Sequence, residues 1–288
     1  MKNLSIFCLQ FTTFCVALCK RNKMTQTTYN YISDYLTKVQ SEGRYTVSLE
    51  ELRGKFNVSE KALLQSIFRL KNKKQLAQVR KEFYVIIPPQ YLNRGMIPPT
   101  LFIDDMMKHL DKDYYVGLLS AAALHGASHQ QPMEFQVITQ KPALRKIKNQ
   151  KLLISFFIKK DWDKEQITEK KSEAGYFNVS TPEMTAFDLV YYNKKVGGLN
   201  RIIPILEDLS EEIKPSLLTK TAKSQKSSTI QRLGYLLDAM GNETLSNSLF
   251  KEIEKKNVKE IPLSLSHNNR NGDVDKRWKL IINTELDF

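Results

Sequence analysis

A basic stretch over residues 53–81 holds the residue types and spacing that best fit recognition of a nucleic acid. It contains nine Lys or Arg residues and one acidic residue, Glu60. Lys61, Gln65 and Arg69 recur at every fourth position, so on a helix they share one face. Arg, Lys and Gln donate to base edges in the major groove, and Lys and Arg neutralise phosphates. The stretch therefore predicts a DNA-binding helix.

The predicted DNA contacts divide into base-reading positions on this helix and phosphate-binding positions at its end and in the hairpin that follows. They are Ser59, Lys61, Gln65, Ser66, Arg69, Asn72, Lys73, Lys74, Arg80 and Lys81. The apolar residues of the helix are expected to face a core, and they are Leu63, Leu64, Ile67, Phe68 and Leu70. The alternative is an ordinary Lys-rich surface on a fold that serves only as an interaction module.

A second basic run over residues 141–160 lacks acidic side chains. Its candidate contacts are Lys141, Arg145, Lys146, Lys148 and Lys151. Such a run extends a DNA surface or binds an acidic or RNA-bound partner. A solvated face is the ordinary alternative, and the sequence leaves the choice open.

Signals for catalysis are weak. Asp161 with Asp163, and Asp273 with Asp275, are carboxylate pairs of the kind that hold Mg²⁺ for nucleotidyl transfer, but no Gly-Ser phosphate loop precedes them. His125 and His129 are spaced i, i+4, yet a zinc site needs further ligands and a helix through Gly126. We therefore expect no metal, no cofactor and no catalytic residue.

The elements around the basic helix predict a winged helix-turn-helix over residues 24–90. An amphipathic helix over 28–39 comes first, and a second helix begins at Ser48, where Glu51 completes a capping box. Ser59 is expected to cap the third, basic helix. Two apolar runs around the polar turn Arg80-Lys81-Glu82 then predict a β-hairpin.

The remaining chain alternates predicted helices and strands, so the fold class is α+β, with a mixed α/β domain over 114–288. Residues 91–113 are expected to be a linker. The predicted strands include 134–139 and 151–160. The predicted helices are 117–126, 181–193, 199–209, 216–223 and 229–241, and a strand-like tail surrounds a polar loop at 267–272.

Composition fits a protein with ordinary cores and an anionic partner. The formal charge is +13 and 41% of residues are hydrophobic. The three cysteines, Cys8, Cys15 and Cys19, lie in an apolar leader over residues 1–23, which fits a reducing cytoplasm. The leader is in the length range of a signal peptide, but no small-x-small cleavage site follows it. We expect translation to start at Met24, with the leader as translated upstream sequence.

Four motifs of the second domain carry a family resemblance. They are YYVGLLSAAALHG (114–126), VSTPEMTAFDLV (179–190), GGLNRIIPIL (197–206) and TIQRLGYLLDAMG (229–241). In this order, after a winged helix, they resemble the AbiEi-type antitoxins of type IV toxin–antitoxin systems, which are linked to abortive phage infection. Most motif residues also have a structural interpretation, with Gly126, Gly198 and Gly241 as helix ends and Ser180 with Glu183 as a capping box.

The resemblance implies a cytoplasmic antitoxin that is not an enzyme and has no membrane partner. Its winged helix would repress its own operon at repeated operator sites in promoter DNA. Its C-terminal domain would counter a nucleotidyltransferase-like toxin, without requiring a stable complex. Two alternatives remain open: a Mg²⁺-dependent nucleic-acid or nucleotidyl-transfer enzyme that uses Asp161 and Asp163, and a transcription factor whose C-terminal domain senses a ligand.

Overall fold

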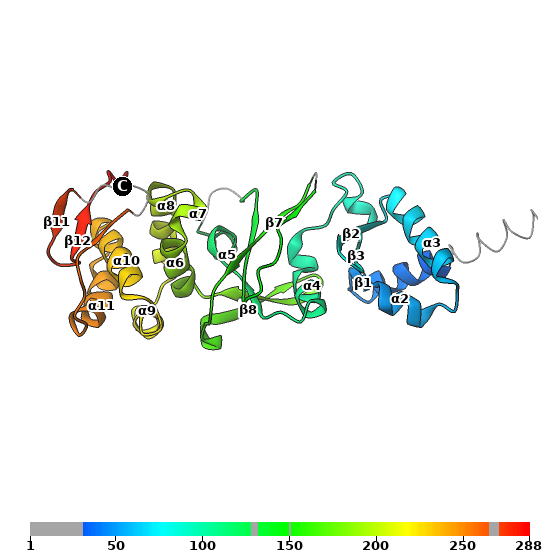
Figure 1. The fold of residues 1–288 in the computed structure, drawn as a ribbon, viewed down its shortest axis with the longest axis horizontal. Helices are drawn as coiled ribbons and strands as arrows, with labels where there is room; N and C mark the ends of the chain where they lie inside the picture. Colours follow the sequence, from blue (N-terminus) through cyan, green and yellow to red (C-terminus); the bar gives the residue numbers. More distant parts are fainter. Residues whose placement is uncertain (1–30, 128–131, 150, 265–270) are drawn as a thin grey trace, which may run out of the picture. The chain divides into compact units, whose positions relative to one another are not determined.

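The structure divides the chain between two units. A computed structural model describes residues 31–127, 132–149, 151–264 and 271–288 (Figure 1). The first unit holds the described residues up to His109 together with Ser172–Gly175, and the second holds Leu110–Lys171 and Tyr176–Phe288. The predicted leader, its start at Met24 and His129 lie outside the described residues.

Helices and a small sheet form the first unit. Its elements are a helix over residues 31–41, β1 (Thr46–Ser48), α2 (Leu49–Lys55), α3 (Glu60–Asn72), β2 (Leu76–Arg80) and β3 (Phe83–Ile86). The strands pair antiparallel in the order β1-β3-β2. Because β3 is central, all four of its residues are buried. Ile32, Leu52 and Leu63 join the sheet residues in one core.

Serine caps begin both helices that precede the hairpin. The Ser48 hydroxyl accepts a hydrogen bond from the Glu51 amide at 3.0 Å, and the Ser59 hydroxyl accepts one from the Ala62 amide at 3.3 Å. Each bond satisfies an amide that has no partner inside its helix. The short polar turn therefore separates two helices that the sequence placed correctly.

Residues 91–109 belong to the first unit, although they were expected to form most of a linker. The short 3-10 turn η1 (Pro89–Tyr91) leads into them, and they contain a second one, η2 (Pro99–Leu101), and α4 (Ile103–His109). The Thr46 hydroxyl donates to the Asp105 carboxylate, and the Phe83 and His109 rings lie 5.1 Å apart. The linker prediction is corrected because this segment buries apolar side chains, among them Phe102 and Met106.

The second unit combines a mixed sheet with helices. Its elements are β4 (Tyr114–Val116), α5 (Leu118–Leu124), β5 (Phe135–Thr139), β6 (Ile147–Lys148), β7 (Leu153–Ile158), η3 (Lys164–Gln166), β8 (Ile167–Ser172), β9 (Gly175–Ser180), α6 (Pro182–Tyr191), α7 (Asn193–Val196), α8 (Leu199–Ser210), α9 (Pro215–Ala222), α10 (Ser227–Ala239), α11 (Glu243–Glu254), β10 (Ile261–Pro262), β11 (Asp273–Asp275) and β12 (Leu280–Ile282). Described strands form a six-stranded sheet in the order β6-β7-β5-β4-β9-β8 and a smaller one in the order β10-β12-β11.

One apolar core joins the larger sheet to the helices of the second unit. It includes Tyr115 of β4, Phe187 of α6 and Leu233 of α10, and α6 contacts α5, α8, α9 and α10 (Figure 1). The α+β class is thereby confirmed. Among the described residues, no helix combines the length and apolar character needed to cross a membrane.

Candidate functional site

The outer face of α3 presents a continuous stripe of exposed side chains. Lys61, Leu64, Gln65, Phe68 and Asn72 are all exposed. Their spacing of i, i+3, i+4, i+7 and i+11 places them along one side of a helix. The stripe carries one cation, two amides and two large apolar groups. A major groove offers hydrogen-bonding edges, phosphates and methyl groups to such a surface.

Three residues of α3 lie on the side opposite to the predicted one. Leu64 and Phe68 were assigned to the core but are 43% and 61% exposed, and Ser66 was assigned to DNA but is 4% exposed. The buried face consists of Leu63, Ser66, Ile67 and Leu70. Successive residues are separated by about 100° around a helix, so Leu64 lies well away from Leu63. Ser66 is therefore corrected to a core position.

The N-terminal end of α3 is partly neutralised. Arg53 of α2 donates two hydrogen bonds to the Glu60 carboxylate, at 2.6 and 3.0 Å, and both side chains are exposed. The Ser59 hydroxyl is occupied as the helix cap. Arg69 is half-buried beside the exposed stripe. Lys61 and Arg69 are thus the cations that α3 itself places on or beside this face.

The predicted phosphate contacts differ in exposure. Lys73, Lys74 and Lys81 are exposed, and Lys81 lies in the two-residue turn of the β2–β3 hairpin. Arg80 is half-buried, and this burial lowers the pKa of its guanidinium. Lys71 donates to the Gln78 side chain at 3.1 Å, which connects the end of α3 to β2. The exposed lysines therefore fit backbone contacts better than Arg80 does.

The second basic run is mostly exposed but is less uniformly positive than its sequence indicates. Lys141, Arg145, Lys148 and Lys151 are exposed, and Lys148 lies on β6 at the edge of the larger sheet. The amine of Lys146, also exposed, lies 2.7 Å from the Glu134 carboxylate, an acid supplied from outside the run. Lys159, near the end of the run, belongs to an internal ion pair with Asp188.

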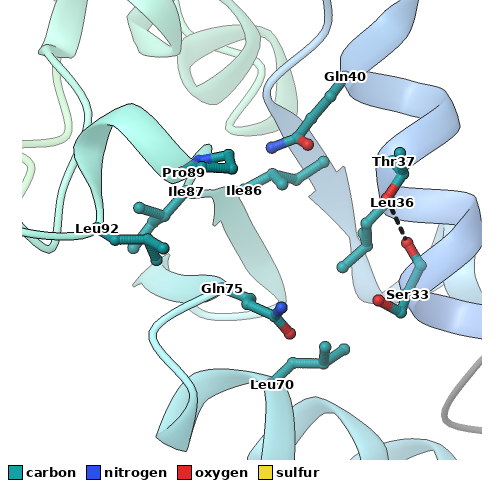
Figure 2. Close-up of a pocket in the computed structure, with 10 residues that line it drawn as sticks. All are labelled: Ser33, Leu36, Thr37, Gln40, Leu70, Gln75, Ile86, Ile87, Pro89 and Leu92. Carbon is teal, nitrogen blue, oxygen red and sulfur yellow. Dashed lines mark hydrogen bonds between the residues drawn. The ribbon is translucent and has the colours of Figure 1, made fainter.

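A small cavity lies beside the core of the first unit (Figure 2). Its volume is about 130 Å³. Its polar lining consists of Ser33, Thr37, Gln40 and Gln75, and none of its lining residues is charged. Ligand sites usually occupy about 300–1,000 Å³. The cavity is too small and too neutral to bind a nucleotide.

A buried polar network crosses the core of the second unit. The Lys159 amine lies 2.7 Å from one carboxylate oxygen of Asp188, and the Tyr115 hydroxyl donates to the other at 2.8 Å. The Asp188 side chain is fully buried, and burial raises the pKa of its carboxyl while Lys159 opposes the rise. Neither Lys159 nor Tyr115 was predicted from the sequence as a partner of Asp188. The signal available was a lysine that directly follows an apolar strand.

Two of the family motifs meet in this core. His125 Nε2 lies 2.7 Å from the Ser180 carbonyl, and burial lowers the pKa of the imidazole. The Ser180 hydroxyl bonds with that of Thr185 at 2.7 Å. The Ser120 hydroxyl accepts from the Gln136 amide at 2.9 Å. These groups hold α5, β9 and α6 together.

The predicted capping box of α6 is wrong in its partners. Thr181 is the N-cap, and its hydroxyl accepts from the Met184 amide at 3.3 Å. Glu183 is buried, and its carboxylate accepts from the Lys214 amide at 3.1 Å. The Ser180 hydroxyl is already bonded to Thr185. Glu183 therefore anchors the segment before α9 instead of closing its own helix.

The fourth family motif, on α10, holds the C-terminal segment. Arg232 donates to the carbonyls of Leu263 and Pro262, at 2.9 and 2.8 Å. Gly234 packs directly under the buried Trp278 ring, and the Trp278 indole donates to Asp238 at 2.7 Å. The motif thus has a structural role in joining α10 to the strands of the tail.

Three of the four paired carboxylates accept hydrogen bonds from nearby backbone amides. Asp161 accepts from the Trp162 amide, Asp163 caps η3 through the Glu165 amide, and Asp275 accepts from the Trp278 amide. Within the described part of the chain, no group of three or more His, Cys, Asp or Glu residues is placed to hold a metal ion. No feature of these carboxylates indicates nucleotidyl transfer.

Comparison with known proteins finds a family domain and a similar fold. Residues 115–239 match the AbiEi antitoxin C-terminal domain, and this match supports an antitoxin role. The resemblance is confirmed over this part of the chain. Its fold is similar to the crystal structure of the RV2827C protein from Mycobacterium tuberculosis, with a TM-score of 0.62 and 16% identity over 87% of this chain and 90% of that one. No curated protein sequence matches the chain.

Proposed function

We propose that this protein is the antitoxin of a type IV toxin–antitoxin system that counters a nucleotidyltransferase-class toxin. The observation that carries the proposal is the match of residues 115–239 to the AbiEi antitoxin C-terminal domain. The second unit would supply neutralisation without catalysis and without requiring a stable complex with the toxin. Asp161, Asp163 and Asp275 accept hydrogen bonds from nearby backbone amides, which supports a non-catalytic role.

We further propose that the first unit is a winged helix-turn-helix domain that represses its own operon in the cytoplasm. A helix, β1, α2, α3 and a β-hairpin follow one another in the order of that fold. In such domains the recognition helix enters the major groove, and pairs of domains read repeated sites. The exposed Lys61, Gln65 and Asn72 on α3, with Arg69 beside them, support this assignment.

Co-expression tests the antitoxin role. The neighbouring gene, expected to encode a nucleotidyltransferase-like toxin, is induced alone and together with this chain, and growth is measured. We expect this chain to restore growth. An Arg69→Ala variant should restore growth equally, because Arg69 lies in the unit proposed to bind DNA. Continued growth arrest with well-expressed wild-type antitoxin would contradict the proposal.

Binding to the DNA upstream of its own gene tests the repressor role. Gln65→Ala and Arg69→Ala are each expected to weaken binding by about 1–3 kcal/mol if the side chain contacts a base. Lys251→Ala on α11 removes an exposed lysine of the second unit and serves as the control. Fluorescence anisotropy at fixed salt provides the measurement. Wild-type affinity in both α3 variants would show that α3 is not the reading helix.

A further inference from the structure

The exposed apolar side chains of α3 lie within the face proposed to enter DNA. Phe68 is 61% exposed, and Leu64, one turn earlier, is 43% exposed. Asn72 lies one turn after Phe68, so Phe68 is near the middle of the exposed stripe. Neither Leu64 nor Phe68 belongs to the core of the first unit. Their exposure therefore suits a binding partner whose surface has both apolar and polar groups.

The surroundings of Phe68 favour a duplex over a protein surface. Protein interfaces bury apolar centres from which charged residues are depleted. Here Lys61, Gln65 and Asn72 share the stripe with the two apolar side chains, and nine basic residues against one acidic residue occupy positions 53–81. A strongly positive surface attracts a polyanion. In the major groove, the apolar feature of a base pair is the C5-methyl group of thymine.

We propose that Phe68 and Leu64 contact thymine methyl groups in the operator, and that they select A·T pairs at those positions. This inference rests on the proposed DNA-binding function of α3. Amide side chains such as Gln65 and Asn72 can bond the N6 and N7 atoms of adenine. An A·T pair offers the methyl on one strand and those atoms on the other, which matches the mixture of groups on the stripe.

Replacing thymine by deoxyuridine tests the proposal, because it removes only the methyl group. Each thymine in the DNA upstream of the gene is replaced in turn, and binding of the full-length protein is measured. Burial of one methyl contributes about fourfold in affinity. We therefore expect at least one replacement to weaken wild-type binding by about that factor, and to have no effect on Phe68→Ala or on Leu64→Ala.

Two variants serve as controls. Tyr176→Ala removes an exposed aromatic side chain from the second unit and should retain the wild-type sensitivity to deoxyuridine. Phe68→Leu keeps an apolar group and should recover part of that sensitivity. Because Phe68 is exposed, its variants should unfold at the wild-type temperature, which is checked by circular dichroism.

The outcomes separate this inference from the function on which it rests. If Arg69→Ala weakens binding while no deoxyuridine replacement distinguishes wild type from either Phe68→Ala or Leu64→Ala, the thymine contact is wrong and the DNA-binding role stands. If wild type does not bind the DNA, both are wrong. A Phe68→Ala variant that changes the sedimentation coefficient and leaves deoxyuridine sensitivity intact would overturn the inference in favour of self-association.

Discussion

The two units differ in the burial of their candidate functional residues. In the second unit, the motif residues His125, Ser180, Asp188 and Arg232 turn inward and bond to other segments of the core. In the first unit, Lys61, Gln65 and Asn72 of α3 are exposed, and Ser66 is the polar residue of α3 that is buried. A motif that identifies a family can thus belong to its structural core, while the surface of α3 that we propose to bind DNA carries none of the four motifs.

Breaking the ion pair between Lys159 and Asp188 in the second unit is expected to give the largest change in the free energy of unfolding. Removal of one partner from a buried ion pair costs about 3–5 kcal/mol, and Lys159→Ala should fall at the low end because the lysine side chain is 15% exposed. Urea unfolding provides the measurement. The neighbouring Lys160→Ala, at an exposed position, should leave the free energy of unfolding close to wild type.

A double variant sharpens this test. Lys159→Met with Asp188→Leu removes both charges, so its loss of stability should be smaller than the sum of the losses in the two single variants. The Tyr115 hydroxyl loses its acceptor in this double variant. Additive costs would mean that the pair does not act as a unit. DNA binding by the folded variants should stay at the wild-type level, since the change lies in the other unit.

The same substitution at two helical glycines compares the units directly. In Gly234→Ala, the new Cβ would lie 2.1 Å from Trp278 ring atoms, and such overpacking costs about 1–3 kcal/mol. In Gly54→Ala on α2, no atom lies within 4 Å, so the better helix propensity of alanine should stabilise the protein by about 0.5–1 kcal/mol. Thermal unfolding of both variants should therefore shift in opposite directions. Equal shifts would contradict the close packing of Gly234 on Trp278.

Periodicity and capping predicted most elements of the fold. Ser48, Ser59 and Thr181 begin helices where the sequence placed their starts, and the apolar runs before Pro88 form β2 and β3. β8 and β9 were missed because their residues are largely polar and only partly buried. α11 was missed although Asn242 caps it.

The exposed face of α3 was harder to predict than the helix itself. A sequence shows that α3 is amphipathic, but the direction of its core face depends on which helices and strands pack against it. Ser66 is polar but small enough to lie in the core. Phe68 is hydrophobic, yet its side chain is exposed. Similarly, Glu134 neutralises Lys146 from a segment that the basic run does not include. Such pairings depend on the tertiary structure.

The salt dependence of DNA binding separates the two basic surfaces. Each phosphate contact contributes about 0.9 to the slope of log affinity against log salt concentration. Lys61→Ala should reduce the slope by about that amount if Lys61 contacts a phosphate. Lys146→Ala should leave the slope unchanged, because Lys146 is paired with Glu134 in the second unit. A reduced slope for Lys146→Ala would instead extend the DNA surface to the second unit.

The smallest expected effect is a pH dependence from His125. Burial lowers the pKa of its imidazole, and the neutral ring donates from Nε2 to the Ser180 carbonyl. The unfolded chain therefore takes up the proton first as the pH falls below about 6.5, and this contribution to stability is lost as the pH falls through the folded pKa. His125→Gln retains a donor for Ser180 but does not titrate. Urea unfolding between about pH 8 and about pH 5.5 should show a smaller loss of stability for this variant. An identical loss in both proteins would mean that the motif histidine does not couple the core of the second unit to pH.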